Sequence, residues 1–262
     1  MTSALQMGWR RGHLELRSLF RDRQRLTFTF TLPMILLLVF GSVFNTEILP
    51  GVSFSQYFTA GIIASGVVYT TFQNLAITIP MERADGSLKR LRGTPMPMAS
   101  YFIGKAISVV VTYVAQVTLL IILGAALFHV QVPTTLEAWS TFIWVSILGL
   151  ASCTLLGIAF SSVPKNAKAA PAMVTPIVLV LQFTSGVFFQ FNTLPLWMRT
   201  VASFFPLKWL CQGMRSVFLP PQAASLQPGG SYHLGLVALV LLAWTIAGAV
   251  LAWKSFRFVD DA

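Results

Sequence analysis

Six apolar segments, separated by polar or charged stretches, dominate the pattern of this chain. None of them contains Asp, Glu, Lys, Arg or His, and each has at least 18 residues. A helix of about 20 apolar residues crosses a hydrocarbon core of about 30 Å, so the pattern predicts six transmembrane helices. They cover residues 27–44, 54–79, 106–128, 138–163, 169–189 and 234–253.

Composition and charge agree with a membrane protein. Apolar residues make up 55% of the 262 residues and charged residues only 10%, whereas soluble domains carry about 25% charged residues. Fifteen of the eighteen Lys and Arg residues fall on one side of the six segments, and only Arg199, Lys208 and Arg215 fall on the other. By the positive-inside rule, both termini are expected in the cytoplasm of a multi-pass protein of the cell (inner) membrane. The formal charge of +10 is thus explained by topology, and no nucleic acid partner is expected.

The polar ends of the chain are expected on the cytoplasmic side. Residues 1–26 are rich in arginine, so no cleavable signal peptide is expected. Leucines and a phenylalanine between the arginines predict a helix in the inner interface of the bilayer over residues 5–25, with a solvated tail as the alternative. Residues 254–262 are expected to form a cytoplasmic tail. Three aromatic residues fall near the ends of spans, where interfacial side chains are common: Tyr101, Trp139 and Trp253.

The sequence shows no motif of a catalytic, metal-binding or nucleotide-binding site. Cys153 and Cys211 have no metal-ligand spacing, and no nucleophile motif or carboxylate pair indicates an enzyme. The chain has no phosphate-binding loop, so any ATP must be bound by another chain. An ion-coupled carrier usually needs an ionisable group within the membrane, and the six segments hold no acidic or basic side chain. We therefore expect no catalytic residue, no metal and no cofactor in this chain.

The stretch "MERADGSLKRLRGTPMPMASY", Met81 to Tyr101, interrupts two apolar segments with a short, basic helix over residues 85–93. Asp85 is suited to cap its start, Gly93 to occupy the position after its end, and Pro95 to prevent its continuation. Leu88 and Leu91 lie three apart and are expected to present an apolar knob to the cytoplasm, among Lys89, Arg90 and Arg92. An ordinary basic loop is the alternative.

This stretch resembles the intracellular loop of ABC-2 type (type-2 ABC exporter) transporter permeases, in which Glu leads into Gly-Ser/Thr-Leu-Lys/Arg-Arg-Leu and then Pro. In that family the short helix is the coupling helix, which docks on a separate ATPase subunit. The resemblance assigns this contact to one set of residues, with Glu82 near the junction with the second span: Glu82, Asp85, Gly86, Ser87, Leu88, Lys89, Arg90 and Leu91.

A second similarity covers Thr184 to Arg215, "TSGVFFQFNTLPLWMRTVASFFPLKWLCQGMR". It matches the late family signature of Ser-Gly-aromatic, Leu-Pro-x-Trp, Pro-Leu and Arg, although Gln190 stands where many members have Pro. In the family this region forms part of an external lid, which implies a gate made by Ser185, Gly186, Leu194, Pro195, Trp197 and Pro206. Residues 190–232 are too apolar for a free loop, and their proline breaks predict a re-entrant hairpin. An amphipathic surface segment is the alternative.

Polar residues inside two spans predict a route for the substrate. Gly66, Thr70, Asn74 and Thr78 recur every four residues, which places them on one helical stripe. The fifth span offers further polar and aromatic side chains, and in similar permeases these two spans line the path. The predicted path residues are Thr70, Gln73, Asn74, Thr78, Thr175, Gln182 and Phe183. Simple hydrogen bonding between helices is the alternative.

Together these patterns predict an all-α membrane protein with six transmembrane helices over residues 27–253, an N-terminal interfacial helix, a short cytoplasmic coupling helix and an extracellular re-entrant hairpin. The resemblance implies the permease subunit of an ABC exporter, working with an ATPase subunit that binds ATP and Mg²⁺ and with a second permease subunit, identical or not. A lipophilic or amphipathic drug or antibiotic is the expected cargo. Lipid export, cell-surface polysaccharide export and an ion-coupled carrier are the alternatives.

Overall fold

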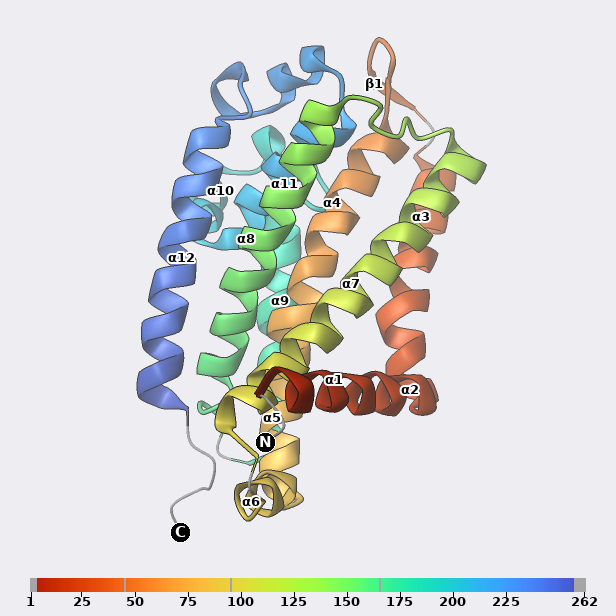
Figure 1. The fold of residues 1–262 in the computed structure, drawn as a ribbon. Coiled ribbons are helices and arrows are strands. Elements are labelled where there is room, and N and C mark those ends of the chain that lie inside the picture. Colours follow the sequence, from red (N-terminus) through yellow and green to blue (C-terminus); the bar gives the residue numbers. More distant parts are fainter. Residues whose placement is uncertain (1–3, 45, 95, 165, 257–262) are drawn as a thin grey trace.

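Long helices run side by side between two ends of the molecule (Figure 1). The computed structural model describes residues 4–44, 46–94, 96–164 and 166–256. The short helix α6 (Ser87–Arg92) lies at one end, which we call the α6 end. A two-stranded hairpin of β1 (Glu47–Leu49) and β2 (Val52–Ser53) lies at the other, which we call the hairpin end. Pro95, Lys165 and residues 257–262, to which the sequence assigned roles, lie outside the described residues.

Helices make up nearly all of the remaining structure, and two of the turns within them are π-helical. Before α6 the chain forms α1 (Ala4–Arg21), α2 (Arg23–Leu26), the π-turn η1 (Thr27–Thr31), α3 (Leu32–Val43), α4 (Phe54–Val68), the π-turn η2 (Tyr69–Gln73) and α5 (Asn74–Ala84). After α6 it forms α7 (Met98–Phe128), α8 (Leu136–Phe160), α9 (Ala169–Thr184), η3 (Phe191–Thr193), α10 (Leu196–Phe204), α11 (Pro206–Phe218), η4 (Pro221–Leu226), η5 (Pro228–Gly230) and α12 (Leu234–Ser255).

Four helical stretches among the described residues are long and apolar enough to cross a membrane. They are Phe54–Ala84, Met98–Phe128, Leu136–Phe160 and Leu234–Ser255. Two shorter apolar helices, Thr29–Val43 and Ala169–Thr184, correspond to the first and fifth predicted segments. All six predicted apolar segments are therefore helical, and four of them have the length of a complete span.

Helix α4 occupies the centre of the bundle and α12 its periphery. From Ser55 to Val68 every residue of α4 is buried, including Gln56 and Thr59. Polar side chains of this kind are costly against lipid, so they favour a position surrounded by other helices. Helix α12 carries few such groups and buries only 17% of its apolar window. The distribution of polar residues along the apolar segments thus explains which helix is central.

The fifth segment ends earlier than its hydrophobicity predicts. We expected a span over residues 169–189, but α9 ends at Thr184. Gly186 has a φ of +80°, and the N–H of Val187 bonds to the carbonyl of Gln182. This is the pattern of a Schellman cap, in which glycine adopts the left-handed conformation without a steric penalty. The apolar residues that follow form a turn instead of continuing the helix.

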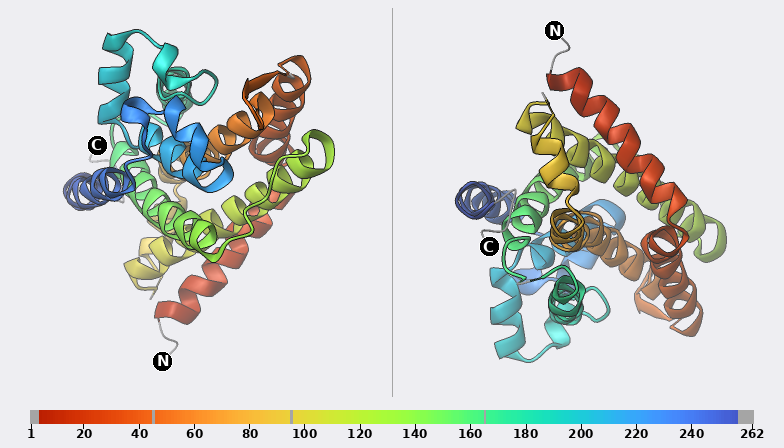
Figure 2. Two further views of the ribbon diagram at one scale, coloured as in Figure 1. Left: turned by 90° about the horizontal axis from the view of Figure 1, so that it is seen from above. Right: turned by 90° about the horizontal axis from the view of Figure 1, so that it is seen from below.

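Helix α1 lies across the α6 end of the bundle and packs along α7 (Figures 1 and 2). Its close approach depends on Gly8 and Gly12, which lie one turn apart on the face towards α7. A Cβ atom at Gly8 would lie 2.5 Å from the side chain of Ile103, and one at Gly12 would lie 2.8 Å from Ile107. Small residues spaced by four allow two helices to approach closely. The arrangement places the charged residues of α1 beside α7.

The corner between α10 and α11 lies beside the middle of α12. The indole N–H of Trp244 donates a hydrogen bond to the carbonyl of Phe204 (2.8 Å), and the Phe205 ring stacks on Trp244 with an interplanar angle of 10°. Trp244 is ten residues after Leu234, which corresponds to about 15 Å along the helix. The chain turns from α10 into α11 at this corner. Both helices start at the predicted breaks, Pro195 and Pro206.

Candidate functional site

A cavity of about 640 Å³ opens near the α6 end, between α3, α5 and α9. Its volume falls within the range of small-molecule sites, about 300–1,000 Å³. Polar and apolar side chains share its lining. The lining residues are Asp22, Thr29, Leu32, Tyr69, Gln73, Asn74, Ile77, Thr78, Met81, Pro171, Thr175, Val178 and Leu179.

Both π-helical turns contribute to this cavity. Thr29 belongs to η1, and Tyr69 and Gln73 belong to η2. A π-turn adds one residue to a helical turn and often occurs at functional sites, because it turns side chains away from the regular helical register. Each π-turn therefore points polar side chains at the same space from a different helix.

The cavity brings together four of the seven predicted path residues: Gln73, Asn74, Thr78 and Thr175. Thr70 does not line it, although Asn74, one turn further on, does. Thr70 instead lines a smaller cavity and donates a hydrogen bond to the carbonyl of Gly66 (2.8 Å).

The other two predicted path residues lie further along α9, towards the hairpin end. Gln182 is buried, and it forms a hydrogen bond with the Tyr69 hydroxyl of η2. Phe183 packs on Phe188 with a centroid distance of 4.8 Å. This ring pair continues into a group of phenylalanines that includes Phe58 of α4. These two residues are therefore part of the packing beyond the cavity and not of its lining.

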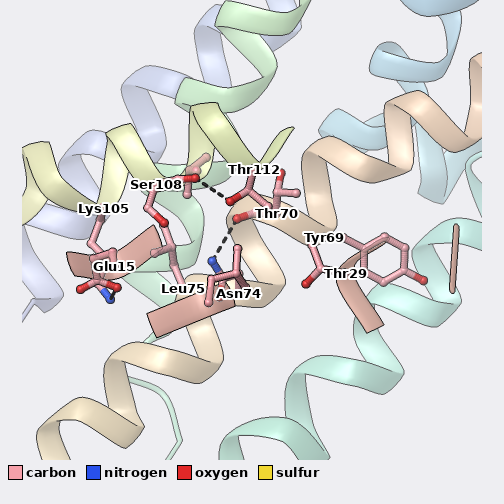
Figure 3. A pocket seen from close by; sticks show the side chains of 11 residues that line it. Glu15, Thr29, Tyr69, Thr70, Asn74, Leu75, Lys105, Ser108 and Thr112 are labelled. Atoms are coloured by element: carbon pink, nitrogen blue, oxygen red, sulfur yellow. Dashed lines mark hydrogen bonds and ion pairs between the residues drawn. The ribbon is translucent and has the colours of Figure 1, made fainter. Parts of the chain in front are cut away.

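A second, much smaller cavity of about 30 Å³ lies beside the first (Figure 3). Such a volume has room for water but not for a larger ligand. Thr29, Tyr69 and Asn74 line both cavities, and Glu15 and Lys105 line the small one. Polar side chains around it bond to their own helices. Thr112 donates to the carbonyl of Ser108 (2.7 Å), and Asn74 donates to that of Thr70 (3.3 Å).

An ion network next to the small cavity connects α1, α5 and α7. Lys105 of α7 is ion-paired with Glu82 of α5 and with Glu15 of α1, the latter at 3.0 Å. Glu82 also accepts a hydrogen bond from the Tyr101 hydroxyl (2.8 Å), and Glu15 pairs with Arg11 (2.8 Å). Two acidic and two basic groups thus balance one another. Lys105 is only 3% exposed, so the pairing offsets the cost of burying its charge.

Sequence reasoning missed this network. Lys105 was counted with the cytoplasmic loop, but α7 begins at Met98, so Lys105 lies two turns inside a helix. Tyr101 was expected at the lipid interface, but it is completely buried because its hydroxyl bonds to Glu82. The signal available in the sequence was a basic and an acidic residue, Lys105 and Glu82, placed directly beside apolar segments on the same side of the membrane.

Helix α6 forms where the sequence predicts it and lies beyond α5. The Asp85 carboxylate accepts a hydrogen bond from the N–H of Ser87 (2.8 Å), while the N-cap position itself is Gly86, with a φ of +75°. Hydrogen bonding from the Ser87 side chain lowers the pKa of the Asp85 carboxyl. Burial opposes this effect, while the Ser87 N–H and the Arg90 charge lower the pKa further. At the other end, Gly93 directly follows Arg92 as the C-cap, with helical φ and ψ.

The orientation of α6 differs from the prediction. Leu88 is 1% exposed and packs with Leu75, Ile79 and Tyr101, and Leu91 packs against the same cluster. The leucines therefore attach α6 to the bundle and do not form an apolar knob facing the cytoplasm. This follows from the size of the helix, because six residues cannot form a stable helix unless one face is covered. Lys89 and Arg90 lie on the exposed face.

The residues predicted to form an external gate are divided between two environments. Ser185 and Gly186 are buried, and the carbonyl of Gly186 accepts a hydrogen bond from Arg215, whose guanidinium lies 3.7 Å from the centre of the Tyr57 ring. Pro206 is buried at the start of α11. Trp197 of α10 is 66% exposed, and Leu194 and Pro195, which precede α10, are not buried. Within the described part of the chain, no group of His, Cys, Asp and Glu is arranged to hold a metal ion.

Comparison with known proteins identifies the family. The family model of the ABC-2 type transporter matches residues 7–219, a stretch that includes both cavities, the ion network and α6. YvfS of Bacillus subtilis (strain 168), named as a transport permease, is 20% identical over 195 residues, which are 73% of this chain and 77% of that protein. Two proteins named as transport permease ycf38 are also similar. That of Porphyra purpurea is 23% identical over 71% of this chain and 65% of its own length, and that of Pyropia yezoensis is 22% identical over 84% and 78%. The chain belongs to the ABC-2 type transporter permease family.

Proposed function

We propose that this chain is the membrane subunit of an ATP-binding cassette exporter that moves a lipophilic or amphipathic compound, of the drug or antibiotic class, out of the cell. The family membership supports a role in transport. The proposal adds the direction, the cargo class, a separate ATPase subunit that binds ATP and Mg²⁺, and a second permease subunit. It places the protein in the cell (inner) membrane, with both termini in the cytoplasm.

The observation that carries the cargo class is the lining of the 640 Å³ cavity. Gln73, Asn74 and Thr78 supply hydrogen-bonding groups from η2 and α5, whereas Leu32 and Val178 supply apolar surface from α3 and α9. A ligand with an apolar body and a few polar groups satisfies both kinds of wall. The cavity lies at the α6 end, which is the cytoplasmic side in the proposed topology, so it would admit cargo from the inner leaflet or the cytoplasm.

The proposed topology has six spans. The two short apolar helices, Thr29–Val43 and Ala169–Thr184, are about 23 Å long, less than the 30 Å of a hydrocarbon core. Each would complete its crossing with flanking residues. Helices α10 and α11 would then form the re-entrant hairpin from the external side, which is consistent with their corner lying beside Trp244.

The proposed route of energy transfer runs from α6 to the cavity. The exposed side chains of Lys89 and Arg90, together with Ser87 and Asp85, would contact the ATPase subunit, while Leu88 holds α6 against the bundle. Helix α5 begins at Asn74 in the cavity wall and ends at Ala84, two residues before α6. A displacement of α6 would therefore move the cavity wall directly. The ion network would transmit the same movement to α1 and α7.

The proposal is tested by reconstituting the chain in liposomes with a candidate ATPase subunit. ATP hydrolysis and ATP-driven uptake would be measured with lipophilic drugs, amphipathic antibiotics, a fluorescent phospholipid and an oligosaccharide. We expect drugs or antibiotics to stimulate hydrolysis, and Thr175→Leu in the cavity to shift the concentration for half-maximal stimulation. Thr118→Leu on the exposed face of α7 should not. Uphill transport by the chain without an ATPase would overturn the proposal, and stimulation by phospholipid or oligosaccharide alone would refute the cargo class.

A further inference from the structure

An apolar groove of about 370 Å³ lies on the other side of α9 from the cavity, between α8, α9 and α12. Val68, Phe72 and Cys153 form its floor, and Phe205, Pro206 and Leu207 close it at the corner between α10 and α11. Its surface is almost entirely apolar and no charged residue lines it. The groove is therefore unsuited to polar ligands and suited to a hydrocarbon chain.

The groove exists because α9 stands away from α8 and α12. Helices α8 and α12 pack tightly against each other, whereas α9 packs mainly against α5, η2, α10 and α11. The view from below shows α9 and α12 on separate sides of this region (Figure 2). Side chains at its edges remain partly exposed: Ile177 is 38%, Leu251 48% and Val163 52% exposed. These side chains leave the apolar groove open to the surroundings of the protein.

The length of the groove corresponds to one leaflet of a bilayer. It runs along α12 from Trp244, beside the corner, to Ser255 at the last residue of the helix. Eleven residues of helix correspond to about 16 Å, close to half of a hydrocarbon core of about 30 Å. A lipid acyl chain entering at the α6 end would thus end at the corner formed by Pro206.

The charges around the mouth of the groove select the headgroup. Lys254 lies in the last turn of α12, and Lys168 directly precedes α9, and both are exposed. The sequence has no Asp or Glu between positions 138 and 259. Basic clusters at the membrane surface attract anionic lipid headgroups.

We propose that this groove binds one acyl chain of an anionic phospholipid from the leaflet at the α6 end, with its headgroup at Lys168 and Lys254. The lipid is a structural ligand and not the cargo. It covers the uncovered side of α9, whose opposite side lines the 640 Å³ cavity through Thr175 and Val178. The bound chain thereby supports α9 in the position that gives the cavity its shape.

The test measures retained lipid, so it does not depend on transport. The full chain, purified with its partner subunits, would be mixed with palmitoyl-oleoyl phosphatidylglycerol or the corresponding phosphatidylcholine, and bound lipids would be counted by native mass spectrometry. We expect one tightly held phosphatidylglycerol per chain. Leu156→Trp, which fills the groove from α8, should weaken its binding roughly tenfold or more, because each CH₂ removed from an apolar site lowers affinity several-fold.

Matched variants separate the groove from the rest of the lipid-facing surface. Ile147→Trp, on the exposed face of the same helix, should retain lipid as the unmodified chain does. Ile177→Trp narrows the groove from α9 and should reproduce Leu156→Trp if that variant fails to fold. Lys168→Gln with Lys254→Gln should keep a bound lipid but lose the preference for phosphatidylglycerol. Unchanged retention in both groove variants would overturn the proposal, as would loss of self-association at unchanged lipid retention, which would assign the groove to a second copy of the chain.

Discussion

Lys105 and Glu82 form an ion pair that connects α7 to α5, the helix that leads into α6. The same ammonium group reaches Glu15 of α1, so one buried charge joins three helices that are distant in the sequence. In the proposed transporter this pair lies on the path between the ATPase contact and the cavity. Its removal should therefore affect both folding and coupling.

Replacing Lys105 with Met should leave Glu82 without its counter-charge, while Glu15 keeps its pair with Arg11. Loss of one partner of a buried pair destabilises a protein by about 3–5 kcal/mol, so we expect a marked fall in the thermal unfolding midpoint of the purified protein. Lys105→Met combined with Glu82→Gln should recover much of this loss, since Glu82 then carries no unpaired charge and Glu15 keeps its pair with Arg11. Lys89→Met removes an exposed lysine outside the ion network and is the control. A Lys105→Met variant as stable as its parent would show that the network has no structural role.

Leu88 and Lys89 are neighbours on α6 with opposite environments, and they provide a test of how α6 works. Leu88→Asp places a charge in the buried cluster and should reduce the yield of folded protein, because a buried charge without a partner is strongly unfavourable. Lys89→Asp with Arg90→Asp changes only the exposed face, and should leave folding intact while weakening co-purification with the ATPase subunit. Both outcomes are read from size-exclusion profiles and pull-down yields. The opposite pattern would restore the leucines as the docking surface.

Asp85 makes the start of α6 sensitive to acid. Its pKa is lowered in the folded chain, so its contribution to stability is present above the ordinary carboxyl pKa and is lost as the pH falls through the lowered value. Amide exchange of residues 86–92, corrected for the intrinsic effect of pH, should therefore accelerate on acidification. Asp85→Ala should accelerate it at neutral pH, because loss of a capping side chain costs about 0.5–2 kcal/mol. If the variant and the parent exchange alike at neutral pH, Asp85 does not cap α6.

Gly8 determines how closely α1 approaches α7. Gly8→Val introduces a branched side chain where even a Cβ atom would be 2.5 Å from Ile103, and overpacking of this kind costs about 1–3 kcal/mol. We expect a lower unfolding midpoint and faster proteolysis of α1. Gly235→Val is the control, because no heavy atom lies within 4 Å of a Cβ at that position in α12. Equal effects of the two substitutions would contradict the close crossing.

The positions of the helices could be predicted from the sequence better than their ends and their irregular turns. Apolar runs locate the six helical segments because burial in lipid requires them, and Asp85 with Gly93 marks α6. Hydrophobicity did not show where α9 ends, since the residues after Gly186 are also apolar and only the backbone conformation of that glycine ends the helix. The π-turn η2 likewise has no signature in the pattern of apolar residues.

Side-chain partners were the least predictable part of the site. The bonds of Lys105 connect residues 23 and 90 positions apart, and no local pattern reports such pairings. The sequence also did not show which way Leu88 points. The apolar face of a short helix can pack against its own chain or against a partner protein. Gln73, Asn74, Thr78 and Thr175 were found together because polar side chains inside apolar segments are rare, and they gather where lipid is absent.

The stretch from Phe54 to Ala84 is a single helical rod of 31 residues, about 46 Å in length. It starts beside the hairpin and ends beside α6. If one end of this rod is pushed sideways, the other end therefore moves in the opposite direction. Rotation about its long axis is different, because the wider turn at Tyr69–Gln73 offers a place where twist can be taken up. Tilting of the helix would thus be transmitted from one end of the molecule to the other, while rotation of the helix about its own axis could stop at the π-turn.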